Sequence, residues 1–124
     1  MTNRDMSVIV GIGARRGVTA QEVCAAIECA LHDSGLNLNS VRMFASSRLK
    51  EDEIGIIDAI RSLGREIAFL DDETINACTP RSPSEASRFG LVGVAEPSAL
   101  ALSNEKELIL EKRIYGRVTI AIAQ

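Results

Sequence analysis

The stretch Val8-Ile9-Val10-Gly11-Ile12-Gly13-Ala14-Arg15-Arg16-Gly17 decides the fold, because an apolar run passes directly into glycines and then into a helix start. Residues 6–12 are apolar and rich in β-branched side chains, which predicts a short buried strand that ends at the glycines. Thr19, followed three residues later by Glu22, has the pattern of a capping box and predicts that a helix begins there. A strand, a glycine turn and a helix N-terminus in this order are typical of an anion-binding site.

The turn itself carries groups that would hold an anion. The planar guanidinium groups of Arg15 and Arg16 pair well with carboxylate or phosphate oxygens. Gly11, Gly13 and Gly17 allow the backbone to come close to a ligand, and the first-turn N–H groups favour negative charge. The sequence therefore predicts a pocket for a small, multiply anionic ligand. The structural alternative is that the glycines only form a tight turn and that both arginines are solvated.

Length and composition narrow the class of protein. The 124 residues predict one domain, 1–124, with an aliphatic core, since aromatic residues make up 3% of the chain. The formal net charge of −3 argues against a nucleic-acid-binding protein, which normally carries a basic surplus. No apolar run approaches the ~20 residues of a membrane span and no signal peptide is evident, so we expect a cytoplasmic protein without a membrane partner.

Metal and nucleotide sites are disfavoured. The three cysteines, Cys24, Cys29 and Cys78, form no CxxC pair, and we expect reduced thiols. The single histidine, His32, has no partner at the spacing of metal ligands. The glycine spacing is one residue too long for the dinucleotide-binding fingerprint, and no acidic residue follows the second expected strand. We therefore predict no metal and no cofactor.

Strands and helices alternate along the first half of the chain. The helix after Thr19 stops at Ser34-Gly35, and a second helix is expected over residues 49–62, with Ile54, Ile57 and Ile60 on one side. The apolar face of the first helix is Val23, Ala26, Ile27, Ala30 and Leu31. The other expected elements are strands at 41–45, 66–70, 107–110 and 117–123, and short helices at 71–76, from 82 onward and at 99–102.

This alternation predicts an α/β fold. We expect a three-layer α/β/α domain with a mixed, mostly parallel sheet and a C-terminal strand pair. In such sheets the ligand crevice lies beyond the carboxyl ends of the strands. The loops that follow the first three expected strands begin at Gly11, Ser46 and Asp71, so these loops are the expected site.

Five further residues are candidates. Lys50 lies just past the second strand and could pair with a carboxylate, while Glu53 could orient it or act as a general base; the alternative is an ordinary charged helix turn. Ser84 lies at a predicted helix N-terminus, where an anion can bind, although helix capping alone explains the pattern. Glu96 is a second candidate base or simply the start of a helix. Lys112 is a candidate ligand residue or a solvated charge at the end of a strand.

Several segments occur in an order that resembles a known family. They are 11–18, 49–53, 83–85, 93–100 and 112–123. Together they resemble the C-terminal domain of the cobalamin-biosynthesis protein CbiG, a domain that also exists alone as CobE. The resemblance extends over residues 8–123. Two positions depart from the pattern, since Ala14 stands where relatives often have Cys, and Pro97 where small residues are usual.

The resemblance implies a role in corrin-ring synthesis. CbiG-like proteins hydrolyse a ring-closing lactone on a cobalt-precorrin and carry an additional N-terminal region. This chain lacks that region, so we expect it to resemble the stand-alone CobE form. The implied ligand is a precorrin or corrinoid intermediate, a large, flat, apolar ring edged with acetate and propionate groups. These carboxylates suit the arginines of the glycine turn.

Three functions follow from these observations. The first is binding of the intermediate by an Arg/Gly-rich anion-binding loop, in a carrier or accessory factor. The second is a CbiG-like hydrolase with Glu53 or Glu96 as its base; no Ser-His-Asp or Cys-His triad is assembled. The third is a scaffold that contacts other cobalamin-pathway enzymes. The expected ligand-binding residues are Gly11, Gly13, Arg15, Arg16, Gly17, Lys50, Ser84 and Lys112.

Overall fold

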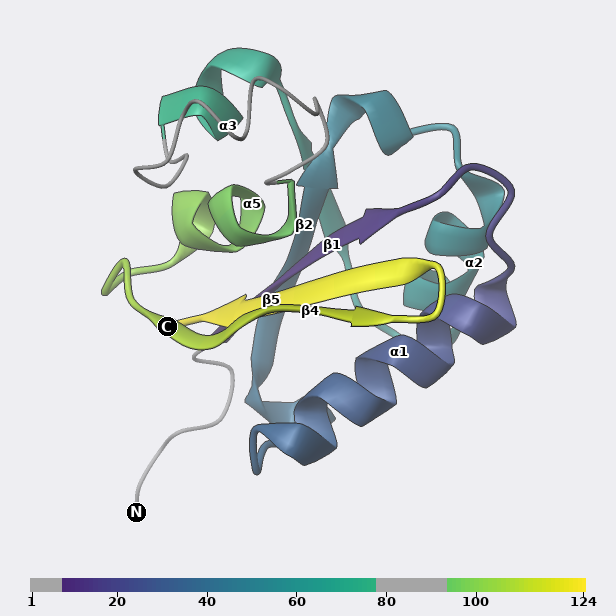
Figure 1. The fold of residues 1–124 in the computed structure, drawn as a ribbon, viewed down its shortest axis with the longest axis horizontal. Helices are drawn as coiled ribbons and strands as arrows, with labels where there is room; N and C mark the ends of the chain where they lie inside the picture. The colour runs from purple at the N-terminus through teal and green to yellow at the C-terminus, as the bar shows by residue number, and fades with distance from the viewer. Residues whose placement is uncertain (1–7, 78–93) are drawn as a thin grey trace.

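The strands form one five-stranded sheet in the order β3-β2-β1-β5-β4 (Figure 1). The computed structural model describes residues 8–77 and 94–124. β1 (Val8–Ala14), β2 (Val41–Ser47) and β3 (Ile67–Leu70) run parallel, whereas β5 (Val118–Ala123) is antiparallel to both β1 and β4 (Leu108–Tyr115). The predicted α/β fold, with a mixed sheet and a C-terminal strand pair, is confirmed.

Two helices cover one face of the sheet. α1 (Ala20–Asp33) packs against α2 (Ile54–Ser62) and across β5, as Figure 1 shows. α1 begins where the sequence predicts, because Thr19 and Glu22 form the reciprocal capping box. All five residues of its predicted apolar face are buried against the sheet. The predicted 3.6-residue periodicity therefore gave the correct orientation of this helix.

The opposite face carries a thinner layer. α5 (Ala95–Leu102) lies across β1, β2 and β5, and α3 (Asp72–Ala77) packs against α5. The core on this side contains small side chains: Ala45, Ala99 and Ala123 surround Ile9. α5 approaches the sheet so closely that a Cβ atom on Gly11 would overlap the carbonyl oxygen of Ala95. Gly11 is therefore required for helix–sheet packing.

The predicted end of the first strand at Gly11 and Gly13 is wrong. Gly11 and Gly13 do not end the strand, since β1 continues through both of them to Ala14. Gly11 pairs with Ala121 and Gly13 with Thr119 in β5. The C-terminal strand supplies these ladder partners from the far end of the sequence, and such tertiary pairing overrides the local turn propensity of glycine. The turn begins at Arg15.

The predicted helix over residues 49–62 divides into two elements. A short 3₁₀ helix, η2 (Arg48–Lys50), follows β2 directly, and α2 begins at Ile54. Of the three isoleucines expected on one side of this helix, Ile60 is buried, Ile57 is half-buried and Ile54 is 70% exposed. Ile54 therefore does not belong to the buried face of α2.

Gly55 explains the orientation of α2. A Cβ atom on Gly55 would overlap the carbonyl oxygen of Val18, so the first turn of α2 rests directly on the backbone of the loop after β1. This contact turns Ile56 and Ala59 toward the sheet, where both are fully buried. The close backbone approach therefore decides which side chains of α2 face the core.

The other boundaries differ by smaller amounts. β4 extends to Tyr115, well past the predicted end at 110, through an irregularity in its register between Leu110 and Arg113. α5 begins at Ala95, ahead of the predicted start at 99. α3 follows its predicted cap, since Asp71 Oδ1 accepts a hydrogen bond of 2.9 Å from the Thr74 amide. η1 (Leu38–Ser40) precedes β2. The helix predicted from residue 82 lies outside the described residues.

Candidate functional site

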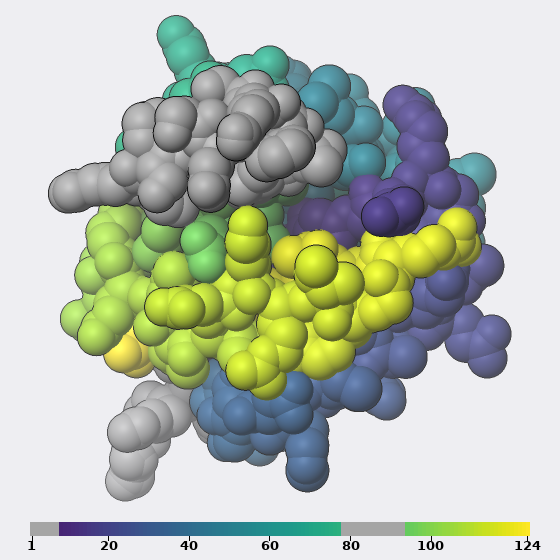
Figure 2. All heavy atoms as spheres, viewed as in Figure 1, coloured from purple at the N-terminus to yellow at the C-terminus, as the bar shows by residue number. Residues whose placement is uncertain are grey.

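The predicted site segments meet at one edge of the sheet. Because β1, β2 and β3 are parallel, their carboxyl ends and the segments that follow them share this edge. We call it the carboxyl edge: the β1–α1 loop (15–19), the segment 48–53 and Asp71. α5 also begins here, since Val94 Cβ lies 3.8 Å from where a Cβ on Gly13 would be. In Figure 2 the purple β1–α1 loop projects at the upper right beside the blue-teal segment after β2.

Several backbone amides of the β1–α1 loop are already hydrogen-bonded within the protein. The Arg15 amide donates to the Arg117 carbonyl at 3.1 Å, and the Gly17 amide donates to Glu53 Oε1 at 3.2 Å. At the start of α1, the Thr19 amide donates to Glu22 Oε1 at 2.9 Å. These amides were expected to receive a ligand anion, but protein carbonyl and carboxylate oxygens accept from them. These three amides are therefore not free to bind a ligand anion.

Glu53 acts as a latch between two segments. Its side chain is nearly buried, with the residue 8% exposed, and it bridges the Gly17 amide to the start of α2. Its other oxygen lies 3.9 Å from Arg16 Nη1, too far for a hydrogen bond, and the Arg16 side chain is 77% exposed. The structure thus brings Glu53 to Gly17 and Arg16 and uses its carboxylate to hold the loop.

The three glycines of the turn have three different environments. Gly17 has a φ of +82°, a left-handed conformation that favours glycine, so it forms the turn as predicted. Gly11 lies beneath α5. Gly13 has ordinary space around it, because the atoms nearest to a Cβ there are 3.8 Å away or further. Of the two glycines inside β1, Gly13 is therefore the one that steric packing does not require.

Four cationic side chains gather on the carboxyl edge. Arg15 and Arg16 come from the β1–α1 loop, and Arg48 and Lys50 from η2. Arg15 and Arg48 are exposed and Lys50 is half-buried, and none of these three side chains makes a hydrogen bond or ion pair with residues 8–77 or 94–124. Cations without internal partners can pair with anions from solution.

Arg48 is a cation of the carboxyl edge that the sequence reasoning did not select. It directly follows Ser47, at the end of β2, and its charge reaches the end of β3. The Thr74 amide chiefly, and Arg48 to a smaller extent, hold the pKa of Asp71 below its usual range. Its position after the second strand was the available signal, since that loop was already expected to line the site.

A fifth arginine is engaged by the protein. Arg117, in the β4–β5 turn, forms two hydrogen bonds with the Glu22 carboxylate, at 2.6 and 3.0 Å. This contact, together with the Thr19 amide, lowers the pKa of Glu22 to about 2. The two hydrogen bonds from the Arg117 guanidinium fasten the start of α1 to the strand hairpin, so Arg117 has a structural role beside the site.

Glu96 and Lys112 are brought together, although through the backbone. Glu96 Oε2 accepts a hydrogen bond of 2.9 Å from the Lys112 amide, in the irregular part of β4. The Glu96 carboxylate is thus occupied by β4, and the Lys112 side chain is exposed on that edge strand. Ser84, the remaining predicted ligand residue, lies outside the described residues.

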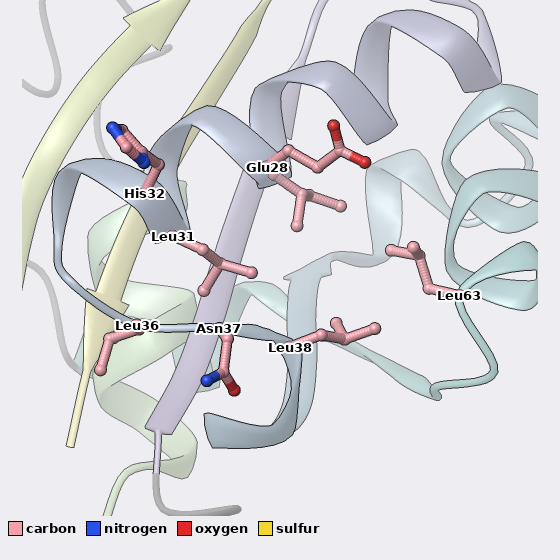
Figure 3. A pocket seen from close by; sticks show the side chains of 8 residues that line it. Glu28, Leu31, His32, Leu36, Asn37, Leu38 and Leu63 are labelled. Atoms are coloured by element: carbon pink, nitrogen blue, oxygen red, sulfur yellow. The ribbon is translucent and has the colours of Figure 1, made fainter.

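Two shallow hollows lie away from the predicted residues. The first, about 280 Å³, lies between the end of α1 and the segment before β2 (Figure 3). Its lining is Ile27, Glu28, Leu31, His32, Leu36, Asn37, Leu38 and Leu63. The second, about 300 Å³, is lined by Ile57, Ile60, Arg61, Arg65, Glu66 and Ile67. Both lie toward the amino ends of β2 and β3, opposite the carboxyl edge, and neither contains a predicted site residue.

The described residues show neither a metal-binding cluster nor a membrane-spanning helix. Within the described parts of the chain, no three His, Cys, Asp or Glu side chains are grouped as metal ligands. Helices in the same parts are too short or too polar to cross a bilayer.

Comparison with known proteins identifies the class. The mixed sheet, covered by helices on both faces, is the fold of a cobalamin-biosynthesis protein of the CobE/CbiG type. The chain belongs to the family described as Cobalamin synthesis G C-terminus, whose model matches residues 8–123. The resemblance found in the sequence motifs is thus confirmed.

Three relatives illustrate this membership. Protein CobE of a Sinorhizobium species is 33% identical over 127 residues, which cover 98% of this chain and 82% of that protein. The cobalt-precorrin-5A hydrolase of Priestia megaterium is 30% identical over 122 residues, or 97% of this chain and 33% of the hydrolase. The crystal structure of CobE from the cobalamin pathway has a TM-score of 0.80 at 33% identity, covering 93% of this chain and 90% of that one.

The relatives differ in how much of their length this chain spans. It corresponds to most of the CobE protein but to about a third of the Priestia hydrolase. The activity of the whole hydrolase is therefore not transferred to this chain by the match.

Proposed function

We propose that this protein binds a precorrin or corrinoid intermediate at its carboxyl edge and acts as a carrier or accessory factor in cobalamin biosynthesis. Arg15, Arg16 and Lys50 capture the peripheral carboxylates, and Arg48 adds a fourth cation. The observation that carries the proposal is that these cations are gathered at the ligand-binding edge of an α/β sheet. Arg15 and Lys50 make no hydrogen bond or ion pair with the described residues, and Arg48 interacts electrostatically with Asp71.

The overall charge strengthens this argument. The chain has a formal net charge of −3, so cationic side chains left unpaired at one edge run against the average character of its surface. Two cations elsewhere, Arg117 and Arg113, form close ion pairs with Glu22 and Asp33, whereas others, such as Arg61, are unpaired like those of the carboxyl edge. Unpaired cations at the edge where α/β sheets bind ligands support an anionic ligand.

The hydrolase alternative is favoured by the likeness to the cobalt-precorrin-5A hydrolase. Both of its candidate bases, however, have structural contacts. Glu53 holds the Gly17 amide and Glu96 holds the Lys112 amide. Each contact uses one oxygen of its carboxylate, so the second oxygen can still accept a proton from substrate or water. Hydrolysis therefore stays the alternative, and a measurement of turnover decides between the two functions.

Visible absorption of the bound intermediate tests the proposed binding function. Purified protein is mixed with a panel of precorrin and corrin intermediates and desalted, and the absorption spectrum of the protein fraction is recorded. We expect a pigment to elute with the protein unchanged. A new spectrum with a new product mass would instead establish catalysis. If no intermediate elutes with the protein, at low salt and high protein concentration, the carboxylate-capture proposal fails and a scaffold role takes its place.

Variants identify the binding edge. The double variant R15A/R16A is expected to lose most of the bound pigment. The control is R61A, since Arg61 is an exposed arginine at the other end of α2 whose side chain makes no hydrogen bond or ion pair with the described residues. Equal losses in the two variants would mean that net charge matters and the carboxyl edge does not. A hydrolase that uses Glu53 as its base would lose turnover in E53Q and keep binding.

A further inference from the structure

Two large apolar side chains stand exposed among the cations of the carboxyl edge. Leu49 and Ile54 are each 70% exposed, whereas most large apolar side chains in the described residues are buried. The other exposed large hydrophobics described, Ile109 and Ile114, both lie on the edge strand β4. The loop segment 49–54 is therefore the place at the site where apolar surface meets solvent.

The backbone that carries these two side chains is held in place. Ser47 Oγ accepts a hydrogen bond of 3.0 Å from the Leu49 amide, and the Glu53 amide donates to the Lys50 carbonyl at 3.0 Å. Ile54 lies between Glu53, which is latched to Gly17, and Gly55, which rests on the loop backbone. Both apolar side chains therefore project from ordered backbone, a preorganised arrangement that reduces the entropic cost of binding.

Leu49 lies between Arg48 and Lys50 in η2, and Ile54 follows Glu53, whose neighbour across the edge is Arg16. Glu51 and Asp52, both exposed, lie between the two apolar residues along the chain, so cations adjoin the apolar pair without enclosing it. Apolar side chains with cations beside them are complementary to a ligand with an apolar body and an anionic border. A small hydrophilic polyanion would gain nothing from the two exposed side chains.

We propose that Leu49 and Ile54 form an apolar step on which the macrocycle of a tetrapyrrole polycarboxylate rests while the surrounding cations hold its carboxylates. This inference depends on the proposed function and specifies how the site selects its ligand class. Two side chains are far fewer than the 20–30 residues per side of an ordinary protein–protein interface, about a tenth. The size of the step thus matches a small amphipathic molecule.

The apolar step predicts that substitution of Leu49 and Ile54 changes the affinity for an anion with a large ring and not the affinity for a ringless anion. Uroporphyrin, a flat octacarboxylate, and citrate, a ringless polycarboxylate, are the probes. The variant L49S/I54T is expected to bind uroporphyrin about tenfold more weakly, because two apolar contacts are lost. Its citrate affinity is expected to stay that of the unmodified protein. R15A/R16A should bind both probes more weakly. Uroporphyrin affinity is measured by fluorescence titration and citrate affinity by equilibrium dialysis.

The matched control removes the same type of side chain at a position outside the carboxyl edge. Ile114 is 73% exposed on β4, three strands from β2 in the sheet, so I114T removes an equally exposed isoleucine outside the carboxyl edge. It is expected to keep full uroporphyrin affinity. Far-ultraviolet circular dichroism and thermal melting check that each variant is folded.

The outcomes separate this inference from the proposed function. If R15A/R16A weakens uroporphyrin binding and L49S/I54T does not, the apolar step is wrong and carboxylate capture stands. An equal loss of citrate and uroporphyrin in L49S/I54T also overturns the step, since the ring would have no special contact. If the unmodified protein binds neither uroporphyrin nor any pathway intermediate, both proposals fail.

Discussion

The Glu53 carboxylate accepts a hydrogen bond from the Gly17 amide, which lies 36 positions earlier in the chain. No local sequence pattern predicts this contact. The spacing of Glu53 from Lys50 suggested a pair for acid–base chemistry at the site. In the folded chain the Glu53 amide bonds the Lys50 carbonyl, while its carboxylate turns to the β1–α1 loop. The residue was rightly placed at the carboxyl edge, and its role as a latch depends on a distant contact.

Substitution of Glu53 tests this latch. E53A leaves the Gly17 amide without its acceptor and is expected to lower the free energy of unfolding by about 1–2 kcal/mol. E53Q retains a carbonyl oxygen for the same hydrogen bond and is expected to cost less than half as much. Urea denaturation measures both changes. Equal destabilisation by the two variants would show that the charge, and not the hydrogen bond, holds the loop.

Gly11 and Gly13 differ in what a methyl group would meet. G11A forces the added carbon against the backbone of α5, and we expect destabilisation of about 1–3 kcal/mol, as for other overpacked cores. G13A meets atoms at ordinary contact distance and is expected to fold normally. Thermal melting compares the two. A strong loss of stability in G13A would contradict the packing described here.

G13A also tests the ligand role of the second glycine. If a ligand approaches the backbone at Gly13, G13A will weaken pigment binding while leaving the melting temperature unchanged. Full binding by G13A would restrict the ligand contacts to the charged and apolar side chains of the edge.

At the scale of elements, α1 and α2 show why one helix was predicted well and the other was not. α1 has a side-chain cap and an apolar face that recurs without interruption, so its signals are local. α2 has no side-chain cap, and Ile54 imitates the apolar periodicity although it faces solvent. Its orientation depends on Gly55 meeting the loop backbone, which periodicity alone does not reveal.

The attachment of α1 to the strand hairpin predicts sensitivity to acid. The pKa of Glu22 in the folded protein is about 2, below the value near 4.3 expected when unfolded. Its contribution to stability is therefore complete above that unfolded value and is lost as the pH falls toward 2. Asp33, bonded to Tyr115 and Arg113, has a lowered pKa and adds to the same trend.

The variant E22Q isolates this contribution. Urea midpoints measured from neutral to acid pH are expected to fall less steeply in E22Q than in the unmodified protein. E105Q is the control, because the exposed Glu105 carboxylate makes no hydrogen bond or ion pair with the described residues. An unchanged acid slope in E22Q would show that the Arg117 fork does not couple folding to pH.

At the scale of the whole molecule, the alternation of strands and helices predicted the layers and the edge where the site lies. The first three strands and the final hairpin occur as expected. The insertion of β5 beside β1 had no local signal, and it is this pairing that keeps Gly11 and Gly13 inside a strand. Arg15, Arg16 and Lys50 were selected because their residue types and their places after strands are visible in the sequence. Arg48 was not selected, and the internal use of the loop amides had no signal in the sequence.

The dependence of ligand affinity on ionic strength tests whether the cations of the carboxyl edge attract carboxylates. If unpaired cations at the carboxyl edge attract carboxylates, the affinity for an anionic tetrapyrrole will fall as salt increases, because exposed charges are screened. The remaining affinity at high salt is expected to depend on Leu49 and Ile54, and to be smaller in L49S/I54T. Titrations of uroporphyrin over a series of sodium chloride concentrations measure both effects. Affinity that does not change with salt would contradict carboxylate capture.

The bond between Glu96 and the Lys112 amide has a consequence for how the molecule coexists with its own copies. β4 is one of the two outer strands of the sheet, β3 being the other, and the unpaired backbone groups of an outer strand can pair with a neighbouring chain. Here an irregular register interrupts the row of pairing groups, and a carboxylate from α5 occupies one of its donors. Charged side chains at Glu111, Lys112 and Arg113 line the same strand. The edge of β4 is therefore a poor template for pairing with another chain, which discourages polymerisation through this strand in a crowded cell.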